Sequence, residues 1–396
     1  MTALLAVEEA LDRILEHVSP LDAESVPVAE ASGRILREPA IARTDLPPFA
    51  SSAMDGFAVR TVETPGVLPV AFRVLAGSPP PGPLPEQAAF AIATGGVVPV
   101  GADAVVPVEQ VVDHGDRVEI AERAIAGRHV RPRGGDVNEG DVIVAAGTRI
   151  RAAHVGSLSA AGVSELVCSR RPRVAVIATG SELRAAGEPL GPGQIYESNR
   201  AMIAAVLRSA GADVDVLPVV EDEVTAHRAT LRLGLSADVL VSSGGVSMGS
   251  HDLVRSVGQE LGVEEVFWGV AVKPGKPLSF GTRGGTLVFG LPGNPVSALV
   301  GTLVFVRSAV LALQGASDPT PRYEPGRTGA SLPRNPHRDE FVRAIRRVGD
   351  DIVLQPISGQ DSHMIGSAAV ADALVHVPRG DGALPSMAPV RYLSLD

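Results

Sequence analysis

Short apolar runs alternate with helix-like segments between residues 171 and 320, and this alternation constrains the fold of the chain more than any other feature. Strands that alternate with helices along a chain build a parallel sheet with helices on both faces. The apolar runs cover residues 174–177, 214–220, 238–241 and 287–289, and the helix-like segments cover 198–209, 224–235 and a last stretch that ends at Leu313. The pattern therefore predicts a doubly wound α/β domain.

The segments on either side of this domain have a different pattern. From about residue 25 to residue 150, and again after residue 320, short β-like runs are broken by proline, glycine and aspartate, which is typical of β-rich structure. Residues 113–116 form a turn cluster between two such runs, so a hairpin is predicted there. An amphipathic helix is predicted near the N-terminus, over residues 2–18.

A chain of 396 residues is longer than one hydrophobic core usually supports, so several domains are expected. The predicted fold class is α/β plus β. The predicted domains are an N-terminal mixed domain (1–45 with 131–170), a β-rich inserted domain (46–130), the central α/β domain (171–320) and a small C-terminal β-barrel or sandwich (321–396).

Charge and composition argue against several classes of function. The formal net charge is −10, which leaves no basic surface for nucleic acid. Cys168 is the single cysteine, so neither an internal disulfide nor a cysteine-based zinc site can form, and the cytoplasm is the predicted compartment. The longest apolar run, residues 296–306, is shorter than a membrane span and ends at Arg307, so no membrane segment is expected.

Lysine occurs at only two of the 35 basic positions, and both lie in the segment Lys273-Pro274-Gly275-Lys276-Pro277. A lysine ammonium is a compact point charge, unlike the planar guanidinium that the chain uses everywhere else. The prolines restrict the backbone and Gly275 permits a sharp bend, so both ammonium groups can point at one small volume. This arrangement predicts an anion between them, and the alternative is a chance pair of surface lysines.

Polar loops follow four of the predicted strands, at the edge of a parallel sheet where ligands usually bind. They cover residues 179–182, 221–223, 242–252 and 290–295. The third loop can offer several backbone N–H groups to a phosphate, although glycines after strands also form plain turns. Glu182, Asp222 and Asp252 supply carboxylates that suit Mg²⁺ beside a phosphate, and the alternative for each is a helix N-cap.

Six motifs stand in order from the first β-rich segment to the end of the α/β domain. They are Met54-Asp55-Gly56-Phe57-Ala58, Gly101-Ala102-Asp103-Ala104-Val105-Val106, Thr179-Gly180-Ser181-Glu182-Leu183, Gly244-Gly245-Val246-Ser247-Met248-Gly249, the lysine segment itself, and Gly290-Leu291-Pro292-Gly293-Asn294-Pro295-Val296-Ser297. Together they resemble the molybdopterin molybdenumtransferases, the molybdenum insertases of the MoeA and gephyrin E-domain family. The resemblance extends from the first helix to the C-terminal domain.

The resemblance implies an Mg²⁺-dependent enzyme of molybdenum cofactor biosynthesis that inserts molybdate into adenylylated molybdopterin and releases AMP. The implied molybdate-binding residues are Lys273, Lys276, Ser297, Arg343 and Ser362. The implied catalytic residues are Asp55, Thr94, Glu182, Asp222 and Asp252, of which Asp222 and Asp252 would hold the metal. The residues expected to bind molybdopterin or its phosphate are Gly244, Gly245, Ser247, Gly249, Pro292 and Asn294.

Asp55 and Thr94 match family positions that reach the cleft from the partner subunit, so the resemblance also implies a homodimer with a shared site. Small-molecule substrates are expected, and the molybdopterin adenylyltransferase is a candidate protein partner. The chain departs from the family pattern at Phe57, Ser181 and Gly135, where tyrosine, aspartate and glutamate are common. The loss of two acids leaves the number of metal ions open.

Two alternative functions are considered. A molybdopterin adenylyltransferase would share the α/β domain and its glycine-rich loop, but it would not need the β-rich segments on both sides. A non-enzymatic scaffold of the gephyrin kind would use a long disordered linker and a second α/β domain, and the sequence shows neither.

Overall fold

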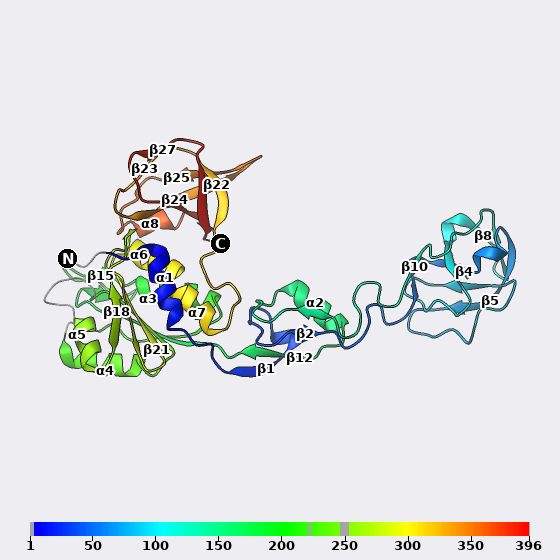
Figure 1. The fold of residues 1–396 in the computed structure, drawn as a ribbon, viewed down its shortest axis with the longest axis horizontal. Helices are drawn as coiled ribbons and strands as arrows, with labels where there is room; N and C mark the ends of the chain where they lie inside the picture. Colours follow the sequence, from blue (N-terminus) through cyan, green and yellow to red (C-terminus); the bar gives the residue numbers. More distant parts are fainter. Residues whose placement is uncertain (1–3, 221–222, 246–252, 396) are drawn as a thin grey trace.

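The computed structural model describes residues 4–220, 223–245 and 253–395. The molecule is elongated (Figure 1). The α/β domain and the C-terminal barrel lie together at one end, and a small mixed domain that contains α2 (Ala152–Ala160) lies in the middle. A β-rich domain lies at the opposite end. The predicted fold class, α/β plus β, is confirmed.

A six-stranded sheet forms the centre of the α/β domain, in the order β16-β13-β17-β21-β20-β18. The strands are β13 (Arg173–Ala178), β16 (Asp213–Val216), β17 (Val239–Ser243), β18 (Glu264–Trp268), β20 (Ser279–Arg283) and β21 (Thr286–Leu291). β16, β13, β17 and β21 are parallel, as predicted. β20 and β18 add an antiparallel edge that the sequence pattern did not predict. Only Gly284 and Gly285 separate β20 from β21, and so short a turn can join only antiparallel strands.

Helices cover both faces of this sheet, which confirms the doubly wound architecture. The helices are α3 (Asn199–Ser209), α4 (Val224–Gly234), α5 (Leu253–Glu260), α6 (Pro295–Gly301) and α7 (Arg307–Leu313). Alternate residues of a strand face opposite sides. Val174 and Val176 of β13 therefore share a core with α3, α6 and α7, whereas Ala175 and Ile177 share another with α4 and α5.

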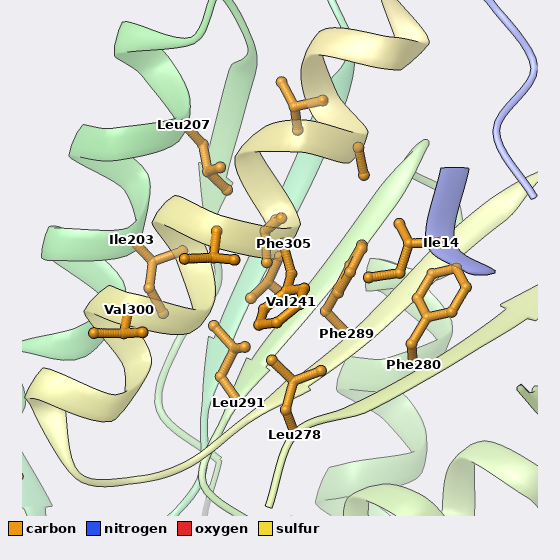
Figure 2. Packing of buried hydrophobic residues seen from close by; sticks show 14 of the residues in the cluster. Ile14, Ile203, Leu207, Val241, Leu278, Phe280, Phe289, Leu291, Val300 and Phe305 are labelled. Carbon is orange, nitrogen blue, oxygen red and sulfur yellow. The ribbon is translucent and has the colours of Figure 1, made fainter. Parts of the chain in front are cut away.

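A π-helical turn over Thr302–Val306 joins α6 to α7, so Pro295–Leu313 is one continuous helix. The helix continues past Arg307, where the predicted apolar run ends, and its 19 residues are enough to cross a membrane by length and composition. However, 72% of its apolar window is buried inside the protein. Figure 2 shows Phe305 of this helix beside Val241 and Phe289 of the sheet. The segment is therefore a core helix of the α/β domain.

The N-terminal helix α1 (Val7–Glu16) packs on the α/β domain. Its buried residues, among them Ile14, belong to the same core as Phe280 and Phe289 (Figure 2). The N–H of Leu5 donates to the carbonyl of Gly269 at 3.4 Å, and the N–H of Ala271 donates back to Leu5 at 2.8 Å. The predicted division assigns this helix to the N-terminal mixed domain, whereas its buried residues share the core of the α/β domain. The apolar face of the helix is buried against a sheet that is distant in sequence.

Five strands of the C-terminal domain close into a barrel, because β24 pairs with both β25 and β26 and the ring continues through β22 and β28. This closure decides between the predicted barrel and the alternative sandwich. The barrel strands are β22 (Glu324–Thr328), β24 (Asp339–Val348), β25 (Ile352–Pro356), β26 (Ala373–Val377) and β28 (Pro389–Ser394). The short strands β23 (Leu332–Pro333) and β27 (Ala383–Leu384) and the helix α8 (Ile365–Ala368) complete the domain.

An arm extends from the α/β domain to the far end of the molecule (Figure 1). The mixed domain in its middle pairs segments that are distant in sequence, β1 (Ala23–Pro27) with β12 (Glu165–Ser169) and β2 (Ala40–Ile41) with β11 (Val142–Val144). A third short ladder joins β3 (Ser51–Ser52) to β10 (Val130–Arg131). The chain thus passes out through the middle domain and returns through it.

The β-rich domain at the end of the arm contains one six-stranded sheet in the order β7-β4-β6-β5-β9-β8. Its strands are β4 (Gly56–Val59), β5 (Gly66–Val74), β6 (Ala89–Ile92), β7 (Ala104–Pro107), β8 (Val111–Asp113) and β9 (Arg117–Ile120). The predicted hairpin is confirmed, since β8 pairs with β9 in antiparallel register. Gly56 is required in β4, because a Cβ there would lie 2.1 Å from the carbonyl oxygen of Val106.

Candidate active site

A cleft of about 510 Å³ lies where the α/β domain meets the C-terminal barrel. The α/β domain contributes the lysine segment and the loop that follows β21, and the barrel contributes β24 and the loop after β25. The sequence-predicted residues that line this cleft are Lys273, Lys276, Pro292, Asn294, Ser297 and Ser362. Tertiary packing therefore brings together residues from three separate segments.

The lysine segment is a tight loop that opens toward the cleft. Lys273 ends the short strand β19 (Val272–Lys273), and Gly275 has a φ of 119°, which favours glycine. The carbonyl of Lys276 accepts the N–H groups of Val270 and Leu278 at 3.0 and 2.9 Å, which ties the two ends of the loop together. Both lysines of this loop line the cleft.

The two lysines differ in their partners. The Nζ of Lys273 donates to Oε1 of Glu340 on β24 at 3.0 Å, and the Lys273 side chain is 52% exposed. Lys276 is also exposed, and it makes no ion pair within residues 4–220, 223–245 and 253–395. Glu340 was not among the predicted site residues. A charged residue in a barrel strand carries no sequence signal that separates it from a surface position.

Asn294 joins the α/β domain to the barrel loop. It precedes α6, and its Nδ2 donates to the hydroxyl oxygen of Ser362 at 2.9 Å. The N–H of Val296 also donates to the backbone carbonyl of Ser362, at 3.0 Å. Ser297, in the first turn of α6, is only 4% exposed. These contacts hold the Ser362 loop against the start of the core helix.

Arg343 lies behind the cleft rather than on its surface. It is 1% exposed, and its guanidinium donates to the carbonyls of Met364, Gly359 and Asp361 at 2.6, 2.5 and 3.1 Å. Burial lowers the pKa of the Arg343 guanidinium, and the nearby Asp361 partly offsets this effect. All of the donors described for this side chain therefore go to one loop, and Arg343 supports that loop from within the barrel.

The glycine-rich loop begins at the end of β17 with two residues in the left-handed region, Gly244 at 91° and Gly245 at 67°. A Cβ on Gly244 would lie 2.9 Å from the carbonyl oxygen of Thr179, so only glycine allows this close approach. The predicted residues Ser247 and Gly249 lie outside the described residues, and so do Asp222 and Asp252.

Asn199 links the end of β17 to the loop that follows β21, and it was missed as a site residue. Its Nδ2 donates to the hydroxyl oxygen of Ser243 at 2.8 Å and to the carbonyl of Gly293 at 2.7 Å. The side chain is buried, with 8% of the residue exposed. In the sequence, Asn199 follows Ser198 at the start of a helix, which favours a simple cap. The structure shows instead that it connects the end of β17 to the loop after β21.

Glu182 is exposed, in the loop after β13. Its carboxylate lies over the backbone of Gly180, where a Cβ would be 2.5 Å from Oε2. Within the described part of the chain, no three histidine, cysteine, aspartate or glutamate side chains are grouped closely enough to hold a metal ion.

Asp55 and Thr94 form a second polar group, in the β-rich domain. Oδ1 of Asp55 accepts the N–H of Thr94 at 2.7 Å and its hydroxyl at 3.2 Å. Asp55 directly precedes β4, which lies at the opposite end of the molecule from the barrel and α6 (Figure 1). Within one chain, therefore, the fold does not bring this pair to the lysine cleft.

Comparison with known proteins covers the whole chain. The family descriptions "MoeA N-terminal region (domain I and II)", "Probable molybdopterin binding domain" and "MoeA C-terminal region (domain IV)" match residues 5–162, 175–312 and 325–393. Molybdopterin molybdenumtransferase 2 of Mycobacterium tuberculosis is 40% identical over 374 residues, which is 89% of this chain and 90% of the relative. The molybdopterin molybdenumtransferase of Haemophilus influenzae is 32% identical, over 94% of both chains. This chain belongs to the MoeA family of molybdopterin molybdenumtransferases.

The fold of this MoeA-family chain agrees with solved structures over almost its full length. Two crystal structures of the molybdopterin biosynthesis MoeA protein from Pyrococcus horikoshii match 99% of the chain, with TM-scores of 0.82 and 0.86 at 30% and 27% identity. Each of the three matched family regions carries part of the candidate site. The N-terminal region carries Asp55 and Thr94, the molybdopterin-binding region carries the lysines, and the C-terminal region carries Glu340 and Ser362.

Proposed function

We propose that this chain makes molybdenum cofactor by inserting molybdate into adenylylated molybdopterin, with release of AMP. One observation carries the proposal: in a chain that matches the MoeA family along its length, both lysines open onto one cleft between the α/β domain and the barrel. Molybdate is a tetrahedral dianion, and the cleft offers two ammonium groups with Ser297 and Ser362 as neutral polar neighbours.

In this proposal some residues neutralise the charge of the substrates and others orient them. Molybdate and the adenylate phosphate are both anions, so cations are needed to bring them together in a sheltered space. Lys273 and Lys276 would neutralise molybdate, and the loops at Gly244 and Asn294 would hold molybdopterin and its phosphate through backbone N–H groups. Arg343 would act indirectly, because it fixes the loop that carries Ser362. No covalent nucleophile is required.

The proposed reaction also uses Mg²⁺. Asp222 and Asp252 are the proposed ligands and Glu182 is a further candidate, since carboxylate oxygens are the ligands that Mg²⁺ prefers. When bound, the ion would withdraw charge from the phosphoanhydride. Glu182 is exposed, which suits this role.

The active enzyme is proposed to be a homodimer. Asp55 and Thr94 are held together at the end of the arm, far from the cleft of their own chain, so a second chain would have to receive them. The cytoplasm is the proposed compartment, since the one cysteine, Cys168, is free and buried. The molybdopterin adenylyltransferase is a proposed partner, because it would supply the adenylylated substrate.

The test is an AMP-release assay with purified protein, adenylylated molybdopterin and Mg²⁺, with and without molybdate. We expect AMP only when molybdate is present, and a Lys276→Met variant should release it at least about tenfold more slowly. Asp351→Asn, which removes a charge from an exposed ion pair on the barrel, is the matched control. Pyrophosphate formation from ATP and molybdopterin would instead indicate an adenylyltransferase, and no turnover in either assay would indicate a scaffold.

A further inference from the structure

Glu340 places a carboxylate inside the cleft that holds the two lysines. The lining contains three cations, Lys273, Lys276 and Arg338, and two carboxylates, Glu340 and Asp361. Asp361 is exposed, whereas the side chain of Glu340 is only 15% exposed. A carboxylate repels a nearby anion, and it does so more strongly when water screens it less. A cleft built only for tight anion binding would not carry this group.

The position of Glu340 follows from strand pairing between two domains. β19 pairs in parallel with β24, and this register places Lys273 opposite Glu340. The N–H of Asp339, the preceding residue, donates to the carbonyl of Ala271 at 2.9 Å. The buried carboxylate of Asp339 accepts the N–H of Arg379 at 2.8 Å. Backbone contacts thus hold β24 beside the lysine segment and keep Glu340 within reach of Lys273.

We propose that Glu340 is the resident counter-ion of Lys273, and that an oxyanion entering the cleft must compete with it. The inference rests on the proposed function, because it takes the cleft to be the molybdate site. Without an anion, the Lys273 ammonium is paired with Glu340, and Nζ of Lys273 lies 3.0 Å from Oε1 of Glu340. A bound dianion draws Lys273 away from Glu340 and is repelled by the carboxylate that remains. Both effects limit the affinity for the anion and allow it to leave the cleft for the next step.

In this role Glu340 is a positioning residue that sets anion affinity. It differs from a residue that only stabilises the barrel, because its removal should strengthen anion binding instead of weakening it. Lys276 makes no ion pair in the described residues, so it is the lysine that meets the incoming anion first. Lys273 joins only after it leaves Glu340.

The primary test is isothermal titration calorimetry of the full-length protein with molybdate and with tungstate. Glu340→Gln keeps the shape of the side chain and removes its charge, so we expect the Kd to fall about tenfold. Asp351→Asn removes one negative charge from the exposed Arg327 pair of the same barrel and should leave the Kd unchanged. Glu340→Asp keeps the charge and should stay within about threefold of the wild type. An unchanged or higher Kd in Glu340→Gln would overturn the proposal.

A second measurement needs no substitution, and it exploits the two lysines of the chain. Protein labelled only at lysine with ¹³C gives two side-chain Cε signals, because the sequence contains only Lys273 and Lys276. Saturation with tungstate should shift both signals, and the Lys273 signal should move as its contact with Glu340 is lost. A Lys273 signal that stays in place while the Lys276 signal shifts would show that the ion pair persists, and the proposal would fail.

The two proposals fail in different ways. If neither molybdate nor tungstate binds the wild-type protein, and neither lysine signal moves, the cleft is not the molybdate site and the proposed function loses its main support. If the wild type binds either anion but Glu340→Gln binds no tighter, only the role of Glu340 is wrong.

Discussion

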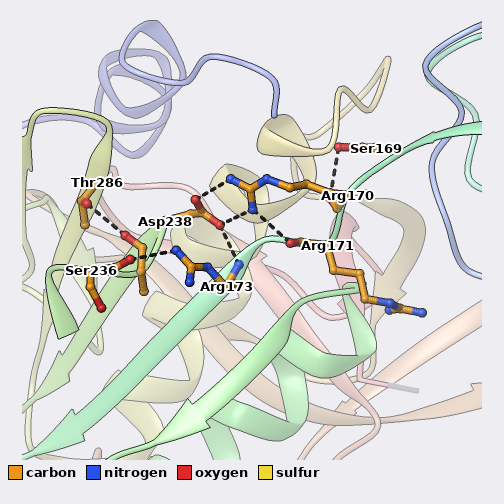
Figure 3. A network of polar contacts seen from close by, with 8 residues as sticks. Ser169, Arg170, Arg171, Arg173, Ser236, Asp238 and Thr286 are labelled. Carbon is orange, nitrogen blue, oxygen red and sulfur yellow. Dashed lines mark hydrogen bonds and ion pairs between the residues drawn. The ribbon is translucent and has the colours of Figure 1, made fainter. Parts of the chain in front are cut away.

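Arg170 donates two hydrogen bonds to Asp238, from Nη1 to Oδ2 at 2.7 Å and from Nη2 to Oδ1 at 2.8 Å (Figure 3). Arg170 directly follows β12 of the arm, and Asp238 directly precedes β17 of the α/β sheet. Oδ2 of Asp238 also accepts the N–H of Arg173 at 2.7 Å. The pair therefore fixes the junction between the arm and the α/β sheet. This junction lies at the amino ends of the parallel strands, whereas the polar loops follow their carboxyl ends.

Asp238→Asn should lower the free energy of unfolding by about 1–3 kcal/mol at pH 7, because it removes the charge from this pair. Burial by itself would raise the pKa of Asp238, but the hydrogen bonds from Arg170 and Arg173 outweigh it, and the pKa is lowered. The stabilisation is thus fully present above the unfolded pKa of about 3.9 and is lost as the pH falls through the folded value. The difference in melting temperature between variant and wild type should shrink below about pH 4.

Arg170→Lys is the control for geometry in this prediction. It keeps the positive charge but cannot make two parallel hydrogen bonds, so it should be destabilised by less than Asp238→Asn. Equal stability of the wild type and Asp238→Asn at pH 7 would show that the pair does not hold the junction.

Mixed dimers test whether Asp55 acts in the cleft of a partner subunit. Asp55→Ala and Lys276→Ala should each be inactive alone, because each removes one half of every site. After unfolding and refolding together, half of the dimers should be mixed and contain one intact site, so about a quarter of the wild-type activity should return. The doubly substituted chain mixed with either single variant should restore none. If the mixture of the two single variants recovers no activity, Asp55 and Lys276 act in the site of the same subunit.

Lys276→Arg tests the shape of the charge in the cleft. The net charge is unchanged, but a planar guanidinium is larger than an ammonium and directs its donors differently. We expect the KM for molybdate to rise about tenfold. The melting temperature should not change, since the Lys276 side chain is exposed. An unchanged KM would show that charge alone matters at this position.

Arg343→Met should loosen the loop that carries Ser362. The backbone carbonyls of Gly359 and Met364 would lose the donor described for them, and that of Asp361 would keep only the N–H of Met364. We expect a loss of about 2–4 kcal/mol in barrel stability, and faster proteolysis within residues 359–364. Arg327→Met, on the exposed side of the barrel, should cost less than about 1 kcal/mol. Similar losses for both variants would contradict the supporting role of Arg343.

The local elements could be predicted because periodicity depends only on neighbouring residues. Val174 and Val176 alternate with Ala175 and Ile177, and all four are buried because helices cover both faces of β13. The hairpin of β8 and β9 follows from its turn residues in the same way. The antiparallel edge strand β18 was harder to predict from the sequence, because a short strand with Glu264 and Glu265 at its start has no clear apolar pattern.

Part of the candidate site could also be predicted from residue types alone. The proline and glycine residues between Lys273 and Lys276 restrict one short segment, so the two charges must lie near each other wherever that segment goes. The partners of those charges could not be predicted. Glu340 and Lys273 are 67 positions apart in the sequence. Only the pairing of β19 with β24 brings Oε1 of Glu340 to 3.0 Å from Nζ of Lys273.

The amino-acid sequence alone determined the alternation of strands and helices, the compact lysine segment and the polar loops, because each depends on residues close together in the chain. The tertiary structure decided that α1 packs on the α/β sheet, that Arg343 supports a loop from behind, and that Asp55 lies at the end of the arm. Those outcomes depend on which apolar faces are buried against each other between distant segments. That choice is a property of the whole folded chain.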